Sequence, residues 1–340
     1  MVDKIKPAGL REVAEASGVS MMTASRALRG LEGVSAAKRQ QILTVADGLN
    51  YVPNRNARSL AVTNSDLIGV SLPTLFNDVF ADILDSMRDV FRKAGYAIVV
   101  ETTEYDSQAE QAWVERLLSW RPAAVVLTGH DHLGRTKTLL RNSAVPVLEI
   151  WDVGPDPIDI GIGLDHVAAG RMLGAYGAGL GYRRPAYVGA AEGFDPRAEA
   201  RFRGLVEAFA PTCPAASWIV ARVEERNPFV AGEIGLAAAL GQGAPDIVFF
   251  LNDHFAVGGL MHCQKQRIAV PDDLGLAGFN ALRIASVVTP DLTTLASPRR
   301  EIGGRGARRL VARLRGVDTR GTEVLDARLV PGGTTRPQGV

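Results

Sequence analysis

The chain has 340 residues, which predicts two or three domains with sizeable hydrophobic cores. Its hydrophobic fraction of 46% and charged fraction of 22% are those of an ordinary soluble globular protein. Cys213 and Cys263 stand far apart and form no CxxC pair, which argues against a disulfide framework and favours a reducing cytoplasm. No apolar signal core follows the first residues, and no stretch approaches the ~18 apolar residues of a membrane span. We therefore expect a cytoplasmic protein without a membrane partner.

The net charge of +1 is unevenly distributed along the chain. Residues 1–65 contain nine basic and five acidic residues, so this head carries +4 and the remainder −3. A basic head on a slightly acidic body favours contact with a polyanion, although a solvated surface would explain the same asymmetry.

Three short helices are predicted within the first 50 residues. An apolar stripe at Leu10, Val13 and Ala14 indicates the first, and the third repeats apolar residues at helical spacing from Ile42 to Leu49. The helix breaker and the two N-caps between these helices are Gly18, Ser20 and Ser35. Three small helices with a tight turn after the first predict a helix-turn-helix.

Beyond Ser65, buried apolar runs alternate with amphipathic helical stretches. The predicted strands are 67–72, 97–101, 124–128, 145–150, 186–190, 218–221, 247–251 and 275–279. The helices predicted between them include 79–93, 107–119, 167–180, 198–210, 229–240 and 255–266. Repeated β-α units imply parallel sheets covered on both faces, and their number favours two doubly wound lobes with a ligand cleft between them.

Two stretches, residues 10–29 and 50–61, carry the patterns VAxxxGVS, TxSRxL and YxPNxxAxxL in order and at fixed spacing. In these features the chain resembles the lactose/galactose-repressor (LacI/GalR) family. The resemblance implies an all-α helix-turn-helix head followed by an α/β, periplasmic-binding-protein-like sensor of two doubly wound lobes. The head would span 1–64 with a hinge helix at about 54–62, and the effector-binding domain 65–340. Its N-lobe would comprise about 66–166 and 296–325, and its C-lobe about 167–295 and 326–340.

The second helix of such a head lies in the major groove of DNA. Met21 and Met22 would then offer apolar contacts to thymine methyl groups. Thr23, Ser25 and Arg26 offer hydrogen-bond donors, and Arg26 is the candidate for guanine readout. The alternatives are ordinary helix packing for the two methionines and a plain surface charge for Arg26.

The segment after Pro53 matches the family's hinge helix, which in the family folds on operator binding. Leu60 stands where paired leucines wedge into the minor groove, and a packed linker leucine is the alternative. Asn54, Arg55 and Arg58 of the same segment are the further predicted DNA contacts.

Resemblance to the family's sensor also names the effector contacts. Arg201 matches the arginine that commonly holds the effector, and a guanidinium suits vicinal hydroxyls or a carboxylate. The other predicted contacts are Phe80, Trp151, Asn252, Asp253 and Asn280, with core packing equally open for the two aromatic residues. Asn280 replaces the aspartate of many relatives, which leaves the pocket more positive and favours an anionic ligand. Residues 149–152 and 155–159 resemble the gluconate-repressor branch, so gluconate or a related sugar acid is the expected effector.

The expected protein is therefore a homodimeric repressor that binds double-stranded operator DNA and a small sugar-type effector. A cytoplasmic sugar-binding receptor and a regulator that responds to a neutral sugar remain alternatives. A sugar-converting enzyme would need a paired acid-base constellation, which we do not find, so no catalytic residue is predicted. No cofactor or metal is predicted either, because His130 and His132 lack a nearby thiol or HExxH partner.

Overall fold

The computed structural model describes residues 8–52 and 65–337. The chain divides into two compact units between Ser65 and Asp66, and each unit is described by itself. No helix within the described ranges is long and apolar enough to cross a membrane.

The N-terminal unit contains three helices, α1 (Leu10–Ala16), α2 (Met21–Leu28) and α3 (Ala36–Gly48). The Ser20 hydroxyl accepts a hydrogen bond from the Thr23 amide at 3.1 Å, and Ser35 caps α3 in the same way. The helices pack around a small core that contains Val13, Ala14, Ala24, Ala27, Ile42 and Ala46. These caps and this core confirm the predicted helix-turn-helix.

The N-lobe of the second unit is built on a parallel sheet with the strand order β11-β5-β4-β3-β1-β2. Its strands are β1 (Leu67–Leu72), β2 (Ala97–Thr102), β3 (Ala124–Thr128), β4 (Val147–Asp152), β5 (Ile160–Leu164) and β11 (Gly321–Val324). The central strands are buried because helices cover both faces, as a parallel sheet requires.

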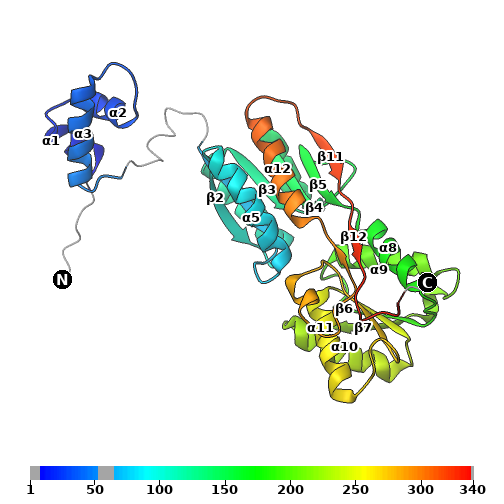
Figure 1. The fold of residues 1–340 in the computed structure, drawn as a ribbon. Coiled ribbons are helices and arrows are strands. Elements are labelled where there is room, and N and C mark those ends of the chain that lie inside the picture. The colour runs from blue at the N-terminus through cyan, green and yellow to red at the C-terminus, as the bar shows by residue number, and fades with distance from the viewer. Residues whose placement is uncertain (1–7, 53–64, 338–340) are drawn as a thin grey trace. The chain divides into compact units, whose positions relative to one another are not determined.

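Two pairs of helices cover this sheet. Helix α5 (Asp78–Lys93) packs against α12 (Arg299–Leu314), which belongs to a much later part of the chain and lies beside α5 in Figure 1. On the other face, α6 (Ser107–Ser119) and α7 (Gly134–Ser143) enclose a core that contains Trp113, Leu117, Val125 and Leu140.

The C-lobe has a parallel sheet with the order β7-β6-β8-β9. Its strands are β6 (Pro185–Ala190), β7 (Ile219–Val223), β8 (Ile247–Phe250) and β9 (Gly275–Ala277). Helices α8 (His166–Gly179) and α9 (Pro196–Phe209) pack together over an aromatic core, and α10 (Pro228–Gln242) packs with α11 (Asp253–Gln266) over a mostly aliphatic one. Two covered parallel sheets confirm the predicted pair of doubly wound lobes.

Short elements complete the second unit. Strand β10 (Thr294–Ala296) pairs antiparallel with β12 (Arg328–Val330), and two 3₁₀ turns are η1 (Ala215–Ser217) and η2 (Arg283–Ser286). Because the chain enters α12 after β10 and leaves β11 before β12, this two-stranded ribbon lies where the chain passes between the lobes.

Helices α8 and α9 approach each other unusually closely. A Cβ atom on Gly170 of α8 would lie 2.0 Å from the carbonyl oxygen of Arg201, and one on Gly204 of α9 would lie 2.0 Å from the carbonyl oxygen of Val167. Only glycine fits at either place, so this reciprocal contact fixes the position of the α9 backbone at Arg201.

Candidate functional site

Helix α2 presents its apolar side chains on two faces. Ala24 and Ala27 are buried in the core, whereas 52% of Met21 and 73% of Met22 is exposed. The methionines therefore do not pack inside the N-terminal unit. Two exposed apolar side chains in the first turn of the helix are available to a partner.

The polar residues of α2 have contacts within the unit. Arg26 donates from Nε to the carbonyl oxygen of Glu32 at 3.1 Å and from a second guanidinium nitrogen to the same atom. The Thr23 hydroxyl lies 2.9 Å from that of Ser20, and Ser25 is half-buried. Arg26 therefore braces the loop after α2, and guanine readout, which would require this bond to open, stays a prediction.

The predicted hinge contacts Asn54, Arg55, Arg58 and Leu60 lie outside the described residues.

In the second unit, the predicted effector arginine lies where strand ends from both lobes converge. Arg201 is on α9, which follows β6, and its guanidinium donates to His166 Nδ1 at 3.1 Å and to the carbonyl oxygen of Leu251, just after β8, at 3.3 Å. The same group lies over the Phe279 ring, 4.3 Å from its centroid. Ligands of doubly wound folds bind at the carboxyl ends of strands, which is where Arg201 stands.

Burial makes the Arg201 environment unusual. Only 7% of the residue is exposed, and burial lowers the pKa of its guanidinium. Its hydrogen-bond partners are an imidazole and a carbonyl oxygen, and it forms no ion pair among the residues that the structure describes. The charge of Asp195 acts on the guanidinium and partly offsets the effect of burial on its pKa.

His166 is the first residue of α8, directly after the N-cap Asp165. Its ring centroid lies 5.4 Å from that of Trp151 and 6.3 Å from that of Phe279. Burial, aided by the positive charge of Arg201, lowers the pKa of His166 to about 3, so the ring is neutral at physiological pH. The sequence did not single out this histidine, because only the fold places it against Arg201.

The two predicted aromatic contacts belong to the hydrophobic core of the N-lobe. Phe80 is 2% and Trp151 4% exposed, and their rings meet edge to face with centroids 6.0 Å apart. Trp151 has a φ of 85°, a conformation that costs a non-glycine residue energy and is frequent near functional sites. Core packing accounts for Phe80, and stacking of either ring on a ligand stays a prediction.

Asn280 follows β9 and also has a positive φ, 103°. Its side-chain oxygen accepts a hydrogen bond from the Ser297 hydroxyl at 3.1 Å, and its carbonyl accepts from Arg299 at the start of α12. The residue is 3% exposed, so it links the C-lobe to α12 of the N-lobe.

Asn252 and Asp253 begin α11. The Asn252 side chain accepts from the Phe255 amide at 3.1 Å and caps the helix. Asp253 is fully buried, and its two oxygens accept from the Thr294 hydroxyl and the Leu282 amide, each at 2.6 Å. Both side chains thus hold the surrounding backbone in place, and a direct contact with an effector stays a prediction.

A second cluster of charged residues contains members from both lobes. Arg197 of α9 pairs with Asp195 at 2.7 Å and lies 3.9 Å from Asp152 at the end of β4, while His130 pairs with the other oxygen of Asp152 at 3.0 Å. Although burial opposes the shift, the charge of Arg197 lowers the pKa of Asp195 to about 2. The hydrogen bond with Asp152 raises the pKa of His130.

Two family descriptions match the chain. Residues 9–54 match the bacterial regulatory proteins of the lacI family, and residues 175–335 match a periplasmic-binding-protein-like domain. The HTH-type transcriptional regulator GntR of Escherichia coli K12 is 35% identical over 308 residues, which cover 90% of this chain and 92% of that protein. The chain belongs to the lacI family.

Solved structures of lacI-family regulators agree with this assignment. A transcriptional regulator from Silicibacter pomeroyi has a TM-score of 0.90 and 32% identity, covering 97% of this chain and 100% of that one. The regulator GntR of Chromobacterium violaceum has a TM-score of 0.74 and 30% identity over 79% of this chain and 99% of its own. This chain is a DNA-binding transcriptional repressor of the lacI family, and the relatives named GntR agree with the predicted gluconate-repressor branch.

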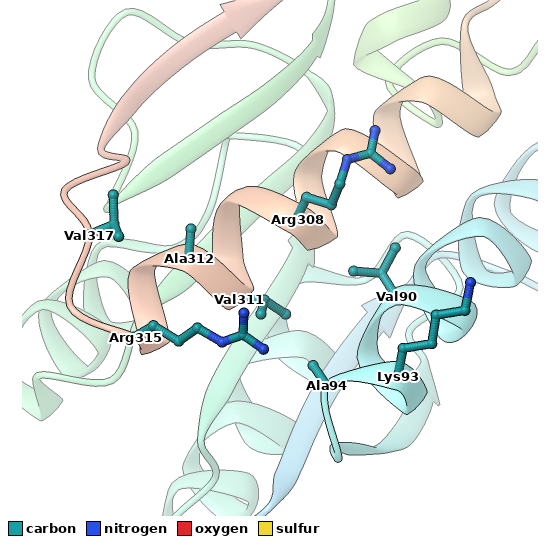
Figure 2. A pocket seen from close by; sticks show the side chains of 8 residues that line it. All are labelled: Val90, Lys93, Ala94, Arg308, Val311, Ala312, Arg315 and Val317. Atoms are coloured by element: carbon teal, nitrogen blue, oxygen red, sulfur yellow. The ribbon is translucent and has the colours of Figure 1, made fainter.

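The lacI-family sensor also has a groove elsewhere on the N-lobe, of about 380 Å³, between the C-terminal ends of α5 and α12 (Figure 2). Its floor contains Val90, Ala94 and Val311, and the cations at its rim are Lys93, Arg308 and Arg315. Helices run back against the strands of a β-α unit, so these helix ends lie at the sheet edge opposite the carboxyl ends of the strands.

Proposed function

We propose that this lacI-family protein is an operator-binding repressor controlled by a sugar acid, gluconate or a close relative, bound between the sensor lobes. The observation that carries the proposal is the buried guanidinium of Arg201, which forms no ion pair within the described part of the chain, although the charge of Asp195 acts on it.

A buried charge is costly unless an opposite charge compensates it. Arg201 retains a planar set of donors that suits the two oxygens of a carboxylate. Asn280, where many relatives carry an aspartate, is neutral and adds no negative charge to the site. A ligand with one acid group and several hydroxyls would therefore complete the electrostatics of the cleft.

We further propose that the protein acts in the cytoplasm as a homodimer on a pseudo-palindromic operator. The exposed Met21 and Met22 and the +4 charge of residues 1–65 support a helix in the major groove flanked by phosphate contacts. We infer that the ligand changes the angle between the sensor lobes and thereby releases the operator.

Calorimetric titration of the full-length protein with D-gluconate, D-glucose and ribose tests the effector. We expect gluconate alone to bind and Arg201→Ala to abolish this binding. Arg171→Ala is the matched control, because this arginine of α8 pairs with Glu207 on the outside of the same helix pair. Binding of a neutral sugar in place of gluconate would refute the sugar acid and leave the repressor assignment intact.

Operator release is measured separately. Fluorescence anisotropy with a labelled operator fragment should show weaker DNA binding once gluconate saturates the wild type, and no change for Arg201→Ala. Tighter DNA binding with gluconate would identify a co-repressor and contradict release.

A further inference from the structure

The hydrogen bond between Arg201 and His166 fixes the tautomer of the histidine. A guanidinium can only donate, so His166 Nδ1, 3.1 Å from an Arg201 nitrogen, must accept. Because the buried ring is neutral, its single proton is on Nε2. His166 therefore presents Nε2–H as a donor and has no acceptor left to offer.

This donor has no partner within the described residues. His166 is only 4% exposed, and its Nε2 atom is fully buried and forms no hydrogen bond there. A buried donor without an acceptor costs about 1–3 kcal/mol. Natural proteins rarely retain such a group without a water, an ion or a ligand to satisfy it.

An unsatisfied acceptor belongs to the same cluster. Asp152 Oδ1 is buried and has no hydrogen-bond partner in the described ranges, and Arg197 remains 3.9 Å from it. Asp152 ends β4 directly after Trp151, whose ring centroid lies 5.4 Å from that of His166. A hydroxyl group accepts one hydrogen bond and donates another, which is what this donor and this acceptor require.

We propose that His166 is a specificity-determining residue that donates from Nε2 to a hydroxyl of the ligand whose acid group Arg201 holds, with Asp152 accepting from that hydroxyl. The inference rests on the proposed function and adds a second requirement to it. The effector must be a hydroxy acid with a hydroxyl near its carboxylate, since His166 and Arg201 are in direct contact.

Two substitutions of His166 test the roles of its two ring nitrogens separately. In His166→Asn the amide oxygen can replace Nδ1 as the acceptor for Arg201, but no donor reaches the position of Nε2. In His166→Gln the amide nitrogen can replace Nε2. Titration of the full chain with D-gluconate should give about tenfold or greater loss of affinity for Asn and a loss below about threefold for Gln.

Deoxy analogues identify the hydroxyl. Titrations with 2-deoxy- and 3-deoxy-D-gluconate should reveal one analogue that binds the wild type at least about tenfold more weakly than gluconate. For His166→Asn the loss of affinity with the same analogue should be several-fold smaller, because only the hydrogen bond to Asp152 is then left to lose. Wild-type affinity of His166→Asn for gluconate, or equal penalties for every analogue in both proteins, would overturn the role of His166. If the wild type binds no acid, the proposed function itself fails, and the role of His166 falls with it.

A spectroscopic readout is independent of affinity. The ¹⁵N shifts of the His166 ring should show the neutral Nε2–H tautomer from pH 6 to 8, and the Nε2–H resonance should shift when gluconate binds. An Nδ1–H tautomer, or a resonance that gluconate leaves unchanged, would contradict the inference.

Discussion

Arg197 of the C-lobe lies 3.9 Å from Asp152 of the N-lobe, within ion-pair distance but too far for a hydrogen bond. Each is already paired within its own lobe, Arg197 with Asp195 and Asp152 with His130. Arg197 also lies over the ring of Tyr105, 5.4 Å from its centroid, so an aromatic contact accompanies the charged one between lobes.

Arg197→Gln should destabilise the sensor by about 3 kcal/mol at pH 7, because it leaves two nearly buried carboxylates without their shared cation. The pKa of Asp195, about 2 when folded, lies below its unfolded value near 4. Its stabilising contribution is therefore present above about pH 4 and is lost as the pH falls towards 2. Urea unfolding at several pH values should show the difference from wild type at its largest above about pH 5.

The control for this prediction is Arg171→Gln. The pair of Arg171 with Glu207 is about half exposed and joins α8 to α9, the helix that carries Arg197. Such a pair contributes at most about 1 kcal/mol. Equal losses for the two variants would show that Arg197 acts as an ordinary surface charge.

Gly170→Ala should lower both stability and gluconate affinity. The new methyl group would lie 2.0 Å from the Arg201 carbonyl oxygen, so α8 and α9 must separate and displace the guanidinium. Overpacking of this kind costs about 1–3 kcal/mol. Gly179→Ala near the end of α8, where a Cβ would meet nothing within 4 Å, is the control in thermal unfolding and calorimetry. A Gly170→Ala variant with unchanged affinity would mean that Arg201 does not need its present position.

Asp253→Asn should remove a pH dependence. Burial raises the pKa of Asp253 to about 7, above its unfolded value of about 3.9, so its contribution is full below pH 4 and is lost as the pH rises through 7. An asparagine can accept from Leu282 and donate to Thr294 at every pH. Urea unfolding should show equal stability near pH 4 and a more stable variant above pH 7. A variant that is less stable at pH 8 would show that the ionised carboxylate is the favoured form.

Met22→Ala should weaken operator binding without changing stability. Its side chain is 73% exposed, so truncation should alter the free energy of unfolding by no more than about 0.5 kcal/mol. A lost methyl contact should reduce specific affinity several-fold while the dependence of binding on salt stays the same, since no phosphate contact is removed. Ala36→Gly at the start of α3 is the control for a general loss of helix stability. A Met22→Ala protein that binds the operator normally would refute the contact between Met22 and DNA.

The sequence predicted the regular elements that have strong periodicity or clear caps. Ser20 and Ser35 signalled two helix starts, and unbroken apolar runs identified strands such as β1 and β3. Strand β5 was missed because its sequence, IGIGL, alternates with glycine, a residue that weakens a strand signal. The second of these glycines is needed, because a Cβ on Gly163 would lie 2.5 Å from the carbonyl oxygen of Trp151.

The candidate site could be predicted only where the family pattern named a residue. Arg201 lies in a buried cluster at the carboxyl ends of the strands, but its neighbour His166 follows a different strand, and no local pattern joins two residues 35 positions apart. The burial of Asp253 was equally hidden, because its partner Thr294 comes from a strand that the apolar pattern did not reveal.

The close glycine contacts occur on both faces of the C-lobe sheet. A Cβ on Gly232 of α10 would lie 1.9 Å from the Phe255 carbonyl oxygen, and one on Gly258 of α11 equally close to that of Phe229, which repeats the arrangement of Gly170 and Gly204. Backbones in such contact cannot slide or rotate against each other without a clash. The helix pair on each face of the C-lobe sheet is thus locked together, and the C-lobe should rotate as a rigid body. Any motion that a ligand induces should then be concentrated in the segments that connect the lobes.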